Sequence, residues 1–263
     1  MTDTNPNGPL TGNVLFYDQP EPLSVEMHGA LGVEPVDQPY AFVGKTNIVP
    51  LTVTEFAPAA LSYPVIFVGD NKQPVAVMGL RDGENLFVGD KGDLRADAYI
   101  PAYVRRYPFV FANDDAQKRM VLCIDRKAPF IKDGGAQPLF VDGQPAPYVQ
   151  QALEFCNNFE TERQRTDNFV KLLQELDLLE TRETTFSPRN PDGTAAPVQK
   201  IAEYFAISED KLKALPLEKL AELRDNGALG QIYAHLVSLL GWDRLIAMAF
   251  DRAARQQATA GNA

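Results

Sequence analysis

The hydrophobic period of this chain changes at Pro147, and no other feature constrains the fold as strongly. Before Pro147, short apolar runs are separated by turn residues such as Asp82-Gly83 and Asp142-Gly143, a pattern typical of strands joined by tight turns. After it, apolar residues recur at intervals of three and four, which is the period of a helix with one buried face. The sequence therefore predicts an α+β fold: a largely antiparallel β-sheet domain with short helices, then a long helix and a C-terminal helical module.

The same patterns predict how the chain is organised. We expect a flexible tail over residues 1–12, a β-rich domain over 13–146, a long helix over 147–180, a linker or exposed hairpin over 181–199, and a helical module over 200–263. Asp82-Gly83 is the strongest hairpin signal. It predicts a type I′ turn joining a strand that ends at Leu80 to a strand over Asn85–Val88, since both central positions of that turn need a positive φ.

The charge balance limits the classes of partner. The chain has 25 Lys plus Arg against 35 Asp plus Glu, a net charge of −10, and a field of that sign repels phosphate backbones and anionic lipid. The best uncharged window, Asn226–Trp242, falls short of the ~20 apolar residues that span a bilayer. Residues 1–13 lack the basic and apolar stretches of a secretory signal. We therefore expect a cytoplasmic protein with no nucleic-acid partner and no membrane insertion.

Metal and cofactor chemistry is disfavoured by the shortage of suitable ligands. The chain has two cysteines, Cys123 and Cys156, and two histidines, His28 and His235, with no metal-site spacing among them. We expect no metal and no cofactor, and a structural role for each histidine. In a reducing compartment, two buried free thiols are expected rather than a disulfide.

Arginine and tyrosine gather in the most distinctive segment, Tyr99–Phe109, around one proline-bounded turn of helix. Another arginine stands in the predicted hairpin. Several guanidinium groups in an acidic chain suit a bidentate site for a carboxylate or a phosphate. The candidate ligand-binding residues are Arg81, Asn85, Tyr103, Arg105 and Arg106.

Two carboxylates beside apolar segments, Glu55 and Asp125, are weak candidates for catalysis. Burial raises the pKa of a carboxyl group toward the range useful for acid–base work. The alternative is structural, because such residues more often cap helices or pair with arginine. In that interpretation Glu55, Glu84 or Asp125 neutralises the arginines and joins sheet to helix.

Uncommon short motifs follow one another over nearly the whole chain: Val49-Pro50-Leu51, Glu55-Phe56, Tyr63-Pro64, Gly79 through Val88, Tyr99 through Phe109, Leu122 through Asp125, Pro138-Leu139-Phe140, Asp142-Gly143, Tyr233 through Leu236, and Ser238-Leu239. In this order they resemble the SapC family. The family takes its name from bacterial surface-layer gene clusters, so the resemblance implies a role in making, exporting or modifying cell-surface proteins. It implies no catalytic residues.

The favoured hypothesis is an accessory or binding protein that acts on a protein or peptide partner in a cell-surface-protein pathway. The alternative is an enzyme acting on a small anionic or peptide substrate. Its arginine cluster would anchor the substrate, and Glu55 or Asp125 would move protons. A pocket with convergent arginines and an unpaired carboxylate favours the enzyme, whereas arginines satisfied within the chain favour the binding protein.

Overall fold

The computed structural model describes residues 14–114, 119–187, 194 and 197–260. The chain forms two compact units and passes back and forth between them. The first unit runs to Val43 and adds Asp90–Asp93 and Tyr103–Thr161. The second unit contains Gly44–Gly89, Leu94–Ala102 and the chain from Glu162 onward.

The first unit is built on two three-stranded antiparallel sheets and a hairpin. The hairpin turn places Asp142 and Gly143 at φ +51° and +75°, as a two-residue type I′ turn requires. The strands are β1 (Pro20–Pro22), β7 (Arg119–Asp125) and β6 (Phe109–Asp114) in one sheet, β8 (Ile131–Asp133), β2 (Leu31–Val33) and β9 (Gln137–Pro138) in the other, and β10 (Phe140–Val141) and β11 (Gln144–Pro145) in the hairpin.

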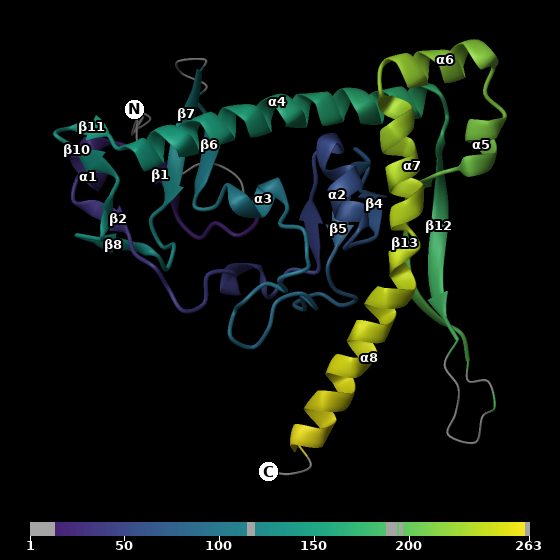
Figure 1. Ribbon diagram of the computed structural model, residues 1–263, viewed down its shortest axis with the longest axis horizontal. Helices are drawn as coiled ribbons and strands as arrows, with labels where there is room; N and C mark the ends of the chain where they lie inside the picture. The colour runs from purple at the N-terminus through teal and green to yellow at the C-terminus, as the bar shows by residue number, and fades with distance from the viewer. Residues whose placement is uncertain (1–13, 115–118, 188–193, 195–196, 261–263) are drawn as a thin grey trace, which may run out of the picture. The chain divides into compact units, whose positions relative to one another are not determined.

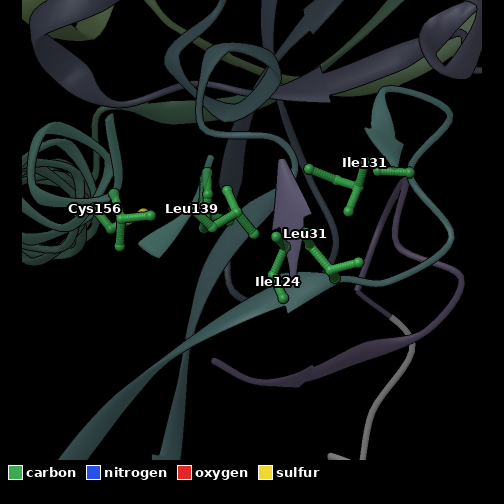
Figure 2. Close-up of a cluster of buried hydrophobic side chains, with 8 residues drawn as sticks. Leu31, Ile124, Ile131, Leu139 and Cys156 are labelled. Carbon is green, nitrogen blue, oxygen red and sulfur yellow. The ribbon is translucent and has the colours of Figure 1, made fainter. Parts of the chain in front are cut away.

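Apolar side chains from these strands and from helix α4 (Pro147–Glu175) make the core of the first unit (Figure 2). Leu31, Ile124 and Leu139 are at most 3% exposed. Cys156 lies in this core and Cys123 lies on β7, and both are buried and free, which confirms the expectation of two unbonded thiols. Burial raises the pKa of Cys123 to about 12 and that of Cys156 to about 11.

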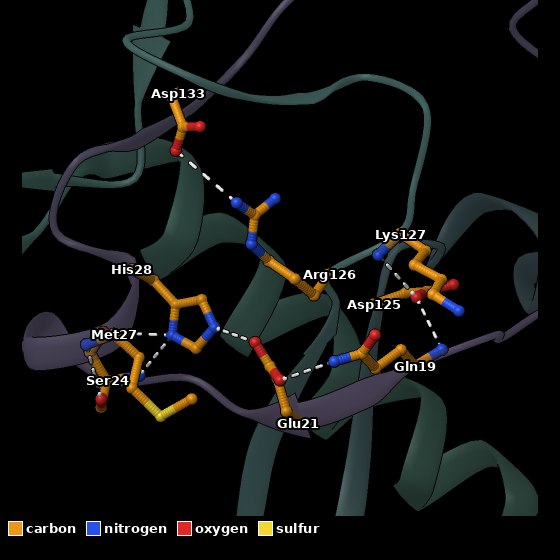
Figure 3. A network of polar contacts seen from close by, with 9 residues as sticks. All are labelled: Gln19, Glu21, Ser24, Met27, His28, Asp125, Arg126, Lys127 and Asp133. Atoms are coloured by element: carbon orange, nitrogen blue, oxygen red, sulfur yellow. Dashed lines mark hydrogen bonds and ion pairs between the residues drawn. The ribbon is translucent and has the colours of Figure 1, made fainter.

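A polar network gives His28 a structural role (Figure 3). His28 ends helix α1 (Val25–His28) and is fully buried. Its Nε2 donates to Glu21 Oε1 at 2.9 Å, and its Nδ1 accepts from the backbone N–H of Ser24 at 3.1 Å. Both ring nitrogens are thus engaged by the unit's own groups. Within the described residues, no three His, Cys, Asp or Glu side chains are grouped so that they would hold a metal ion.

The second unit contains a five-stranded antiparallel sheet, in which β12 and β13 form a long hairpin (Figure 1). The central strand β4 is buried along Val65, Ile66 and Phe67, as expected for a strand with neighbours on both sides. In order across the sheet, the strands are β12 (Leu179–Phe186), β13 (Gln199–Ile207), β4 (Val65–Val68), β5 (Gln73–Val77) and β3 (Ile48–Pro50).

Five α-helices lie wholly within the described residues of the second unit, and one of them, α7, carries the buried His235. On α7, His235 is fully buried, and its Nε2 accepts from the backbone N–H of Ile207 at 3.0 Å. Burial lowers the pKa of His235 to about 3, so the ring is neutral at physiological pH. The described part of the chain has no helix both long and apolar enough to cross a membrane. The helices are α2 (Phe56–Ala60), α5 (Glu209–Lys213), α6 (Leu217–Asp225), α7 (Ala228–Ser238) and α8 (Gly241–Ala260).

The fold class agrees with the α+β prediction: the sheets are antiparallel, and α4 is one continuous helix of 29 residues. The two compact units do not coincide with the segments predicted from the residue pattern. The β-rich stretch 13–146 is shared between the two units, and the predicted module from residue 200 begins with β13. Sheet neighbours come from distant parts of the chain, so runs of one residue pattern do not mark compact units.

The turn at Asp82-Gly83 is not the predicted type I′ hairpin. Only Gly83 has a positive φ, +79°, and the backbone N–H of Glu84 donates to Arg81 O at 3.2 Å, the pattern of a type II turn. Residues 85–88 also do not form the predicted strand: Leu86 and Phe87 lie in a turn, and Val88 makes only an isolated β-bridge with Leu94. Asn85 Oδ1 accepts from the backbone N–H of Phe87 at 2.9 Å, and this local bond favours the turn over a ladder.

Candidate functional site

A pocket of about 330 Å³ in the second unit contains one of the predicted site residues, Arg81. Three parts of the chain form it: the turn after β5, the start of β13, and one side of α8. It combines two cations and a carboxylate with an apolar wall. The lining residues are Leu80, Arg81 and Glu84 from the turn, Gln199, Lys200 and Ile201 from β13, and Ala249, Phe250, Ala253 and Gln256 from α8.

Arg252 fixes α8 against the segment that follows Arg81. Its guanidinium donates to the backbone oxygens of Asn85 at 2.7 Å, Leu86 at 3.3 Å and Val88 at 2.9 Å. Because a charged donor makes stronger hydrogen bonds than a neutral one, these three bonds hold two walls of the pocket together.

Phe250, the aromatic residue that lines the pocket, packs against a residue of β12. The rings of Phe250 and Phe186 contact each other, with 4.6 Å between their centroids. Phe250 nevertheless stays 50% exposed. It therefore offers an apolar ring face beside the charged groups of the pocket.

The two cations of the pocket differ in what they bind within the chain. Lys200 forms ion pairs with Glu183 and Glu203, and these bonds raise the pKa of Lys200. Arg81 is exposed, and among the residues that the structure describes it has no ion pair and no hydrogen bond from its side chain. Arg81 is thus the cation of this pocket whose donors are open to an anion.

A second, smaller pocket of about 200 Å³ lies in the same unit, between α4 and the start of α7. Its lining includes the apolar residues Val53, Phe169, Leu172 and Ala228. Its cation, Arg165, already lies 3.8 Å from Glu162 Oε1. The positive charge of this pocket is therefore already paired, and the pocket is a weaker binding site for an anion than the Arg81 pocket.

Asn85 lies beneath the turn rather than in the pocket. It is 1% exposed, its Oδ1 binds Phe87 N, and its Nδ2 lies 3.7 Å from Met78 Sδ. These contacts shape the segment that carries Arg81, so Asn85 positions the site.

The other predicted ligand-binding residues, Tyr103, Arg105 and Arg106, belong to the first unit. The guanidinium carbon of Arg106 lies 3.9 Å from the ring centroid of Tyr103 and 4.7 Å from that of Phe159, and Arg105 lies 5.3 Å from that of Phe155. Stacking on rings stabilises a partly desolvated guanidinium. Arg81 lies in the second unit, so its convergence with Arg105 and Arg106 stays a prediction.

Glu55 is saturated by donors of its own unit. It is 4% exposed. One oxygen accepts from the N–H and hydroxyl of Thr52, and the other accepts from Tyr99 OH at 3.0 Å and Ala102 N at 2.6 Å. A carboxylate with four donors is held in place, and we assign it no catalytic step.

Asp125 has the same arrangement in the first unit, where it is fully buried. Its oxygens accept from the backbone N–H groups of Asp18, Gln19 and Lys127 and from Tyr107 OH, at 3.0–3.1 Å. Burial, with the neighbouring Asp125 charge, raises the pKa of Tyr107, which keeps the phenol as the donor. Asp125 takes these four hydrogen bonds from backbone N–H groups and a phenol rather than from an arginine.

The family model for SapC matches residues 23–245. The chain belongs to the SapC family. No curated protein and no solved structure matches it. The SapC match includes the Arg81 turn and the β13 side of the pocket, and it ends before the lining residues of α8.

Sequence reasoning found Arg81 but missed the α8 wall of this SapC-family protein. A signal exists at Arg252, which lies seven residues after the buried Leu245 and therefore on the same face of α8. An arginine on the buried face of a helix needs acceptors. Here it binds carbonyl oxygens about 165 residues away in sequence.

Proposed function

We propose that this SapC-family protein is a binding protein that holds a carboxylate of a protein or peptide partner at Arg81. One observation carries the proposal: the Arg81 guanidinium lines a pocket and has no ion pair among the described residues. A guanidinium presents a planar fork of N–H donors that matches the two oxygens of a carboxylate.

The rest of the pocket favours a peptide over a simple anion. Phe250 and Ile201 supply apolar surface for a side chain, while Gln199 and Gln256 carry amides that can donate and accept hydrogen bonds. A volume of about 330 Å³ is at the small end of ligand sites. It suits two or three residues of a larger partner.

Two further parts of the proposal concern the setting. The resemblance to SapC implies a pathway that serves cell-surface proteins, so we propose an accessory role there. We propose the cytoplasm as its compartment. The free thiols Cys123 and Cys156 support this, because a reducing compartment keeps thiols unpaired.

The test uses a library of N-acetylated pentapeptides with free C-terminal carboxylates, selected on the purified protein and measured by fluorescence anisotropy. We expect Arg81→Gln to weaken the best peptides at least tenfold, because a charge-assisted hydrogen bond is lost. Arg165→Gln is the matched control, since it removes one exposed positive charge elsewhere in the same unit. Equal affinities of the wild type and Arg81→Gln would refute the proposal.

One observation favours the enzyme as a second candidate. Glu84 lines the same pocket, and its carboxylate has no ion pair and no side-chain hydrogen bond in the described structure. It is therefore better placed than Glu55 or Asp125 to accept a proton. Incubating selected peptides with the protein, followed by mass spectrometry, separates the two functions: an altered peptide, lost with Glu84→Gln, supports the enzyme.

A further inference from the structure

The pocket meets β13 at the edge of the strand. Gln199 and Lys200 are consecutive residues, and both line the pocket. Successive side chains of a strand point to opposite faces of its sheet, so a pocket lined by both residues lies beside the strand. One edge is already taken by β12, which pairs Thr185 with Lys200 and Phe186 with Gln199. The pocket therefore faces the other edge.

That other edge of β13 has little pairing. Its neighbour in the sheet, β4, pairs with it at one position, Phe205 with Phe67. Over residues 199–204, the described structure has no strand on that side. Unpaired N–H and C=O groups along an edge are a ready surface for an added strand.

A β-bulge lies within the same stretch. The register passes from Thr184 opposite Ala202 to Thr185 opposite Lys200, which leaves Ile201 without a partner residue on β12. A bulge disrupts the local ladder and turns the strand. Ile201 also lines the pocket, so the bulge lies where β13 meets it.

We propose that the partner binds as an extended peptide that adds a strand to the free edge of β13 and places its carboxylate on Arg81. Strand addition gives affinity through backbone hydrogen bonds and specificity through the pockets beside alternate side chains. A strand rises about 3.3 Å per residue, so the edge at Gln199–Ile201 would pair with two or three peptide residues. This inference rests on the proposed function and adds the mode of binding.

The other walls of the pocket agree with an extended occupant. Ala249 and Ala253 lie one helical turn apart on α8 and have short side chains, which leave room for a backbone between helix and strand edge. Phe250 then faces one side chain of the peptide. The position of Arg81 would fix where along the strand edge the carboxylate of the peptide lies.

The decisive experiment is a backbone N-methyl scan of the best pentapeptide from the Arg81-dependent library. Each methyl group removes one N–H donor and leaves the charge and side chains unchanged. We expect losses of about tenfold at alternate positions and small effects between them, because only every second residue of a strand faces a given neighbour. Amidated and internal-aspartate versions of the same peptide distinguish a C-terminal carboxylate from a side-chain carboxylate.

Hydrogen exchange of the full chain provides the readout on the protein side. With peptide bound, the amides of residues 199–204 should exchange more slowly. Binding that needs Arg81 but shows no alternation and no protection at 199–204 would overturn strand addition and leave the proposed function intact. If no peptide binds in an Arg81-dependent way, the proposed function fails and strand addition fails with it.

Discussion

The buried His235 makes the stability of the protein depend on pH in a direction that can be worked out. Burial, with the charge of Arg182, lowers the pKa of the folded-state ring to about 3, whereas an unfolded histidine titrates near 6.5. Between these values the unfolded state binds the proton and the folded state does not. Stability is therefore fully present above about pH 6.5 and is lost as the pH falls toward 3.

The size of the effect follows from the two pKa values. Each pH unit below 6.5 costs about 1.4 kcal/mol, so at pH 5 the His235 contribution to the free energy of unfolding is lower by about 2 kcal/mol. His235→Gln removes the titration, and the glutamine amide oxygen can still accept from Ile207 N. The variant loses ring contact with Phe67, so it should be less stable than the wild type at pH 7 but should lose less on acidification.

Urea denaturation at pH 7 and pH 5 measures this difference. We expect the pH-dependent loss to be about 2 kcal/mol smaller in His235→Gln than in the wild type. Tyr233→Phe is the control, since it changes a half-exposed residue of the same helix and no group that titrates in this range. An identical pH dependence in His235→Gln and the wild type would show that the ring is not kept neutral by burial.

Three further predictions concern stability and reactivity. Arg252→Met keeps the apolar stem but leaves three carbonyl oxygens without their donor, and should lower the free energy of unfolding by about 2–4 kcal/mol in urea melts. Gly83→Val should lower the free energy of unfolding by about 1–3 kcal/mol through its positive φ alone, since a side chain there has open space. Its control is Gly230→Ala, within α7, which should cost no stability in the same assay. Thiol titration should count both Cys123 and Cys156 after denaturation without reductant, and neither should react quickly in the native protein.

The sequence predicts those parts of the fold that depend on local pattern. Helix α4 follows from the spacing of its apolar residues, and the β10–β11 turn follows from Asp142-Gly143, one of the residue pairs that a type I′ turn prefers. The turn after Arg81 contains the same residue pair yet takes another form. The segment that follows this turn is held by Arg252, whose position in space a local pattern does not reveal.

The candidate site was accessible to sequence reasoning only in part. Arg81 was a candidate because several guanidinium groups in an acidic chain suit an anion, and that argument needs no coordinates. The free edge of β13 was not found, because it depends on β4 meeting β13 only at Phe205. For the tyrosine and arginine segment the sequence left two interpretations open, a ligand site or internal ion pairs, and neither foresaw that Arg106 stacks on aromatic rings.

The interleaved path of the chain has a consequence for synthesis in the cell. All residues of the first unit have been made once Thr161 leaves the ribosome, but Gly44–Gly89 must wait for the β12–β13 hairpin and the last helices. At translation rates of about 5–20 residues per second, that delay is on the order of 10 s. During it the apolar strand β4 has β5 as a neighbour and lacks β13. The nascent chain therefore exposes an unfinished sheet, and such unpaired strand edges are prone to aggregate until synthesis is complete.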